Sequence, residues 1–112
     1  MGRRIGDTEE YLFERDNAIV RILREFKGKN NCIKAKELSA RLSLIGYTET
    51  SSALRGILAR IKKDRTLPIC FCDDGYFWAT SQSEIRETID ALEAKMRGLQ
   101  EHIDHLKQFL VF

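Results

Sequence analysis

The C-terminal quarter of the chain carries the pattern that most restricts its fold. From residue 85 onward, apolar residues recur at alternating steps of four and three over more than three heptads. This spacing places an apolar residue at every a and d position, which is typical of a coiled coil. The pattern predicts a coiled-coil dimerisation helix over residues 81–112 whose seam is Ile85, Ile89, Leu92, Met96, Leu99, Ile103, Leu106 and Leu110.

The start of this helix has two ways to cover its apolar residues. Ser81 or Ser83 supplies the N-cap, and the seam then pairs with a second copy along its whole length. Alternatively, Ile85 and Ile89 pack back onto the rest of the chain, and only the later heptads associate. Isoleucine at a with leucine at d favours two parallel strands, but Met96 dilutes this preference, so the strand direction of the dimer stays open.

Upstream of this helix, the chain of 112 residues has room for one compact domain. Residues 1–8 are polar and include two arginines, which indicates a flexible basic arm. Apolar residues at helical spacing predict helices over residues 8–27, 35–44 and 50–64. Two β-favouring runs around a turn at residues 73–75 then predict a hairpin, so residues 9–80 form the expected domain. Most hairpin aromatics are expected in the core, with Phe77 a candidate for an exposed stacking ring.

The basic residues are concentrated in the middle of the chain. The overall formal charge is only +2, but residues 27–65 carry ten Lys or Arg against three Asp or Glu, a local net charge of +7. Such asymmetry predicts an anionic partner, most often nucleic acid, and the alternative is a surface of solvated lysines.

The sequence contains no motif typical of a disulfide framework, a metal site or a catalytic site. Cys32, Cys70 and Cys72 lack the paired spacing of a disulfide framework, which indicates free thiols in a reducing compartment, and we expect a cytoplasmic protein. Neither the cysteines nor His102 and His105 have the spacing of a zinc site, so no metal is expected. There is no phosphate loop, no nucleophile with a base and no apolar run of ~20 residues. We therefore expect no enzymatic activity, no cofactor and no membrane span.

The order of helix, helix, turn, helix and hairpin resembles small bacterial and phage winged helix-turn-helix DNA-binding proteins that carry a C-terminal dimerisation helix. The likeness lies in KELSARLSL, SSALRGILARIKKD, LPIC and GYFWATS, within residues 36–81. It implies an α+β fold with three helices, a β-hairpin wing and a long coiled-coil helix. It also implies a homodimer that binds double-stranded DNA as a transcriptional regulator or phage DNA-binding factor, with helix 50–64 in the major groove.

Carried onto this sequence, the resemblance assigns roles to individual residues. Arg55 would read a guanine, because a guanidinium donates two hydrogen bonds to its major-groove edge. Thr48, Ser51 and Ser52 would face base edges beside it. Phosphate contacts would come from basic residues that give affinity and salt dependence, namely Lys34, Lys36, Arg41, Lys62 and Lys63. Arg3 and Arg4 of the arm would add minor-groove or backbone contacts.

The tip of the expected wing departs from this pattern. Asp73 and Asp74 stand where a DNA-contacting wing would carry Lys or Arg, and two carboxylates are repelled by phosphates. We therefore expect the wing to stay off the DNA or to meet a protein. The alternative function is a winged-helix protein–protein interaction module or a replication-associated adaptor.

Overall fold

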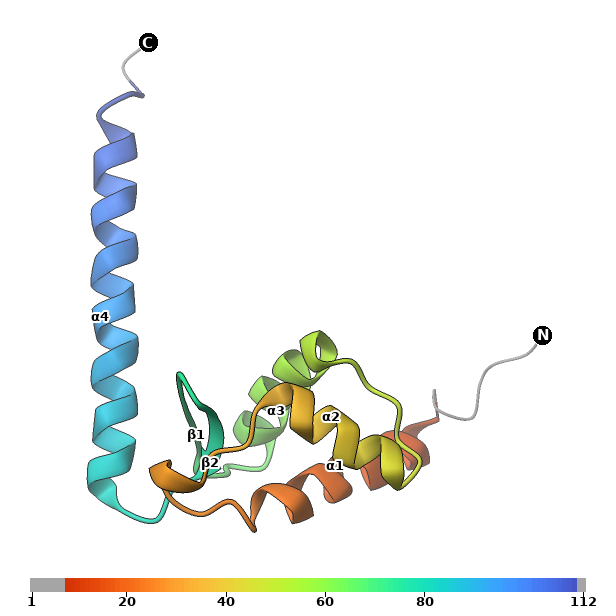
Figure 1. Ribbon diagram of the computed structural model, residues 1–112. Helices are drawn as coiled ribbons and strands as arrows, with labels where there is room; N and C mark the ends of the chain where they lie inside the picture. Colours follow the sequence, from red (N-terminus) through yellow and green to blue (C-terminus); the bar gives the residue numbers. More distant parts are fainter. Residues whose placement is uncertain (1–7, 111–112) are drawn as a thin grey trace, which may run out of the picture.

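The computed structural model describes residues 8–110 and has an α+β fold (Figure 1). A domain of short helices and one β-hairpin is followed by a long helix that projects away from it. The elements in chain order are α1 (Glu9–Leu23), the 3-10 helix η2 (Lys29–Asn31), α2 (Ala35–Leu44), α3 (Ser51–Asp64), β1 (Ile69–Cys72), β2 (Gly75–Trp78) and α4 (Gln82–Lys107).

Hydroxyl side chains begin three of the helices, as the sequence predicts. Thr8 accepts a hydrogen bond from the Tyr11 amide, Thr50 from the Ala53 amide, both at 3.0 Å, and Ser81 caps α4. Each bond satisfies one of the amides that a helix N-terminus leaves without a partner.

Helix α1 ends four residues earlier than predicted, at Leu23 instead of Lys27. The chain turns there because its backbone pairs with β2: the Trp78 amide donates to the Phe26 carbonyl at 2.7 Å, and the Gly28 amide donates to the Trp78 carbonyl at 2.9 Å. Gly28 has a φ of 86°, a conformation that suits glycine. Pairing with a distant strand thus overrides the local helical pattern.

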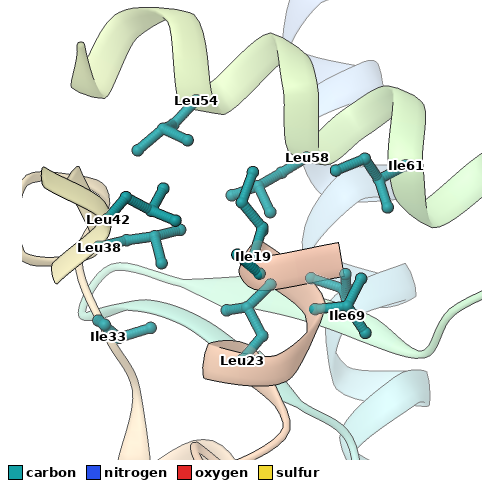
Figure 2. Packing of buried hydrophobic residues seen from close by; sticks show 11 residues of the cluster. Ile19, Leu23, Ile33, Leu38, Leu42, Leu54, Leu58, Ile61 and Ile69 are labelled. Atoms are coloured by element: carbon teal, nitrogen blue, oxygen red, sulfur yellow. The ribbon is translucent and has the colours of Figure 1, made fainter. Parts of the chain in front are cut away.

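The core lies where α1, α2, α3 and the hairpin meet. Figure 2 shows Ile19 of α1 in the centre, below the aliphatic residues of α3 and beside the leucines of α2, with Leu23 beneath it and Ile33 and Ile69 on either side. Burial of these aliphatic side chains is the main force that holds the short helices together. The fully buried aliphatic residues are Ile19, Leu23, Ile33, Leu38, Leu42, Leu54, Leu58 and Ile61.

The hairpin is antiparallel, with Ile69 opposite Trp78 and Cys70 opposite Phe77. Phe77 is only 1% exposed, so the idea of an exposed stacking ring there is wrong. In this register the two faces of the hairpin are both covered: Ile69, Tyr76 and Trp78 pack against the core, and Phe77 belongs to the face beside α4. A strand covered on both faces buries consecutive residues, which the alternation in the sequence does not reveal.

A buried ion network joins α1 to α3. The Arg15 and Asp16 side chains are 7% and 8% exposed and bond to each other at 3.0 Å. Arg15 also donates to Glu49, just before α3, at 2.9 Å, and Arg60 of α3 donates to Asp16 at 3.1 Å. Burial alone would lower the pKa of Arg15, but the hydrogen bonds to Glu49 and Asp16 outweigh it and raise that pKa. The network therefore fixes the start of α3 against α1.

We predict that Asp16→Asn lowers the free energy of unfolding by about 2–3 kcal/mol, because it removes the buried carboxylate that Arg15 and Arg60 share and leaves Arg15 paired with Glu49 alone. Urea denaturation measures the change. The matched control is Asp64→Asn, which removes the other carboxylate near Arg60, at 3.7 Å and largely exposed. An exposed pair contributes about 0.5 kcal/mol or less. Equal losses in both variants would contradict a structural role for the network.

Candidate nucleic-acid interface

A groove of about 730 Å³ lies between the start of α2, the start of α3, the hairpin and α4. The start of α3 and the tip of the hairpin point to the same side of the domain, and α4 extends in that direction (Figure 1). Its walls bring together four of the residues predicted to bind DNA and add a lysine from α4. The polar and charged lining residues used below are Lys34, Lys36, Ser51, Arg55, Asp73 and Lys95.

Arg55 lies between this groove and the neighbouring hollow on the hairpin side of α3. It lines both, and its side chain is exposed. Ser52 is also exposed, whereas Ser51 is half-buried at the first position of the helix. Thr48 lies outside the helix, two residues before the cap Thr50, so it flanks the start of α3 and is not part of it.

The structure divides the ten central basic residues into two groups. Lys29, Arg41 and Arg60 form ion pairs with Glu87, Glu37 and the carboxylates of Asp16 and Asp64. Across residues 8–110 the other cations of this segment form no ion pair. Two of them have other contacts, since Arg65 donates to Asn17 at 2.8 Å and Lys62 lies over the Phe71 ring. In the described range, the cations of this segment that need no rearrangement to meet a phosphate are Lys27, Lys34, Lys36, Arg55 and Lys63.

Arg41 contacts two neighbouring side chains outside the groove. Its guanidinium lies 4.9 Å from the centre of the Phe26 ring and 3.8 Å from Glu37. These two contacts hold the Arg41 guanidinium on the surface of the domain. Arg41 does not line the groove with Lys34 and Lys36. Arg3 and Arg4 lie outside the described residues.

Two lysines from different helices flank the ring of Phe71. Lys62 Nζ of α3 lies 5.3 Å and Lys95 Nζ of α4 lies 5.7 Å from the ring centre. Sequence reasoning assigned Lys62 to phosphate contact but missed Lys95, because its heptad position outside the seam indicates only solvent exposure. Phe71 and Lys95 are far apart in the sequence, so the sequence does not indicate that β1 and α4 are neighbours. The fold brings Lys95 to the groove.

The acidic tip of the hairpin forms one edge of the groove. Asp73 and Asp74 are exposed, and Asp73 is part of the lining. A polyanion in the groove is attracted to the lysine walls and repelled from this edge. The electrostatics thus favour an approach on the side of α2 and α3, away from the hairpin tip.

A carboxylate of α4 fixes this helix beside the hairpin. Glu84 accepts hydrogen bonds from the amides of Thr80 at 2.8 Å and Lys29 at 2.7 Å. These bonds lower the pKa of Glu84. Lys29 Nζ adds an exposed ion pair to Glu87 at 3.2 Å. The first turn of α4 is therefore tied both to the preceding segment and to η2.

The side of α4 that meets the domain differs from the apolar seam. Thr88 and Ala91 line a small pocket against Phe77, and Lys95 faces Phe71. Each of the residues 84, 88, 91 and 95 precedes a seam residue by one position, which corresponds to about 100° around a helix. The domain thus covers one side of α4 and leaves the seam open: Ile89, Leu92, Met96, Leu99, Ile103 and Leu106 are 38% to 68% exposed.

The structure differs from the predicted seam at its two ends. Ile85 is half-buried, but the helix is anchored mainly through Glu84 and Thr88, so packing through Ile85 and Ile89 does not cover the seam. Leu110 was predicted as the last a position, but α4 ends at Lys107 and Leu110 lies beyond it, 78% exposed. A Leu106–Phe109 turn bond closes the helix end, so the heptad pattern runs on past the helix itself.

Within residues 8–110, no three His, Cys, Asp or Glu side chains gather in a way that could hold a metal ion. None of the helices in that range combines the length and the apolar character needed to span a membrane. Comparisons with protein-family models, curated proteins and solved structures find no match for this chain.

We predict that Glu84→Gln loosens the start of α4, because a neutral amide accepts hydrogen bonds from the Thr80 and Lys29 amides less strongly than a carboxylate. Faster hydrogen exchange at these two amides measures the change. Since the folded-state pKa of Glu84 is lowered, its stabilising contribution is present above the ordinary value of 4.5 and is lost as the pH falls through the lowered pKa. In the control Glu87→Gln, exchange at the Thr80 amide should stay unchanged, and equal acceleration in both variants would contradict this anchoring role.

Proposed function

We propose that this protein is a winged helix-turn-helix homodimer that binds double-stranded DNA through the groove beside α3. In this arrangement α2 and α3 form the helix-turn-helix, α3 enters the major groove, and β1 and β2 form the wing. The observation that carries the proposal is the set of unpaired cations, Lys34, Lys36, Arg55 and Lys95, on the walls of one groove at the start of α3. A transcriptional regulator or phage DNA-binding factor without enzymatic activity is the role that fits these parts.

The outer side of α3 supports close approach to DNA. Ser52, Gly56 and Ala59 are exposed and small, and a side chain at Gly56 would meet nothing within 4 Å. A helix of this kind can enter a major groove about 12 Å wide without steric conflict. Arg55 lies beside this small-residue side and is the only arginine among the groove-lining residues, which suits it to recognise a guanine.

A second copy of the chain is the occupant that we assign to the open seam of α4. The seam is built from heptad a and d residues, which pair with an identical seam, and the domain packs on another side of the helix. Both contacts can therefore exist together. A two-fold dimer presents two copies of the groove, so the preferred site would be an inverted repeat.

One observation favours a different class of partner. Asp73 and Asp74 are exposed at the hairpin tip, next to the cations of the groove. A winged-helix protein–protein interaction module would use this acidic tip for a basic partner. Charge reversal at the tip by Asp73→Lys and Asp74→Lys separates the two functions, since it would weaken binding of a basic protein and leave DNA binding intact or stronger.

We predict that Arg55→Ala costs about 1–3 kcal/mol of affinity for a preferred duplex and relaxes its sequence preference, because Arg55 would read a base. Lys36→Ala should weaken binding to all duplexes alike and reduce the salt slope by about 1. Fluorescence anisotropy on a selected site and a scrambled site measures both. The control is Arg21→Ala, since Arg21 is exposed, lies on α1 outside the groove and has no ion pair in the described part of the chain. Equal effects of all three substitutions would overturn the assignment of the groove.

We predict that the wild-type protein has twice the 13.0 kDa mass of one chain in solution, as expected for a dimer. Leu99→Asp should convert it to a monomer, because the dimer would bury an unpaired charge in its apolar seam. Sedimentation equilibrium measures the mass. Ala94→Asp is the matched control: it adds the same charge at an exposed position on the opposite side of α4 and should leave the dimer intact. A monomeric wild type would contradict the dimer.

A further inference from the structure

Two cysteines that are 40 residues apart in sequence meet beside the groove. Cys32 Sγ and Cys72 Sγ are 3.3 Å apart, and both residues are half-buried. Cys32 Sγ also donates to the Lys29 carbonyl at 2.8 Å. The spacing of the cysteines in the sequence indicates only free thiols, so this pair is a product of the fold.

The β pairing explains why the two thiols meet. Ile33 pairs with Tyr76 through two backbone hydrogen bonds of 2.8 Å, so the segment before α2 runs along the free edge of β2. Cys72 pairs with Gly75 on the other edge of that strand. Because side chains alternate along paired strands, Cys32 and Cys72 lie on the same face with β2 between them.

Gly75 makes the close approach of the two thiols feasible. It has a φ of 131°, and a Cβ built there would collide with the Ile33 carbonyl. Any other residue at this position would push the edge segment at Ile33 away from β2. The glycine thus keeps the segment that carries Cys32 close to the hairpin that carries Cys72.

We infer that Cys32 and Cys72 are a site of reversible thiol oxidation, at which a low-molecular-weight disulfide such as oxidised glutathione converts the two thiols to an intramolecular disulfide. The sulfur atoms need to approach from 3.3 Å to about 2.05 Å, by rotation of both side chains together with a shift of the edge segment that carries Cys32. Since both residues are partly exposed, the oxidant reaches them. Cys70 is buried on β1 and does not take part.

The reaction is a balanced thiol–disulfide exchange. One cysteine thiolate attacks the oxidant and forms a mixed disulfide while one glutathione thiolate leaves. The second cysteine gives its proton to water, attacks the mixed disulfide and releases the second glutathione, so that two protein thiols are oxidised and one glutathione disulfide is reduced. Burial and the contact with Cys72 raise the pKa of Cys32 to about 12, which makes the exchange slow at neutral pH and faster in mildly alkaline solution.

The disulfide would join two walls of the proposed DNA-binding groove. Lys34 lies two residues after Cys32 on one wall, and Cys72 itself lines the other. The link closes a long loop that contains α2, α3 and β1, so it restricts the unfolded chain and stabilises the domain. This inference concerns the thiols alone and stands even if the groove binds something other than DNA.

The test is treatment of the purified full chain with oxidised glutathione, followed by peptide mapping and thermal unfolding. We expect a product that has lost two hydrogens, a crosslink between the peptides of Cys32 and Cys72, and a rise in Tm of about 10 °C that dithiothreitol reverses. Cys70→Ser should behave like the wild type.

The variants Cys32→Ser and Cys72→Ser should each give at most a glutathione adduct and no rise in Tm. The inference is wrong if the wild type keeps three free thiols, stops at mixed adducts, or forms its crosslink through Cys70 or between two chains. Because the readout is covalent mass and Tm, failure of DNA binding does not affect it.

Discussion

The buried contact between Arg15 and Asp16 is the constraint on which the arrangement of the domain depends. Both side chains are buried, where an unpaired charge would be costly, so their partners Glu49 and Arg60 are held in place with them. Glu49 precedes α3 and Arg60 lies on it, which means that the network sets the position of α3 relative to α1. The start of α3, and with it the groove, follows from that placement.

Ion pairing also separates the structural cations of the surface from those that are available to bind a partner. Arg60 and Lys29 are engaged by carboxylates and act as structural residues, whereas Lys34, Lys36 and Arg55 line a groove and form no ion pair in the described range. Glu84 holds the first turn of α4 against η2. In this position Lys95 of α4 reaches Phe71 at the groove, and the apolar seam stays open to a second copy of the chain.

Much of the fold was accessible from the sequence because its signals are local. Caps such as Thr50, the apolar stripe of α3 and the turn at Asp73 depend on neighbours within a few residues. The early end of α1, the burial of Phe77 and the contact of Lys95 with Phe71 depend on partners far away in the chain, as does the Cys32–Cys72 pair. In the candidate site, the sequence predicted the cations of α2 and α3, but it could not separate paired residues such as Arg41 from unpaired ones.

The most direct measurement of the central proposal is the salt dependence of binding between the wild-type protein and a labelled duplex, compared with the matching single strand. If Lys34, Lys36 and Lys95 each neutralise one phosphate while Arg55 contacts a base, log K should fall against log salt with a slope of about −2.7 per protomer, from about −0.9 per contact on B-DNA. The duplex should bind more tightly than the single strand. Absence of duplex binding at low salt, or affinity that does not change with salt, would contradict the proposal that this groove binds DNA.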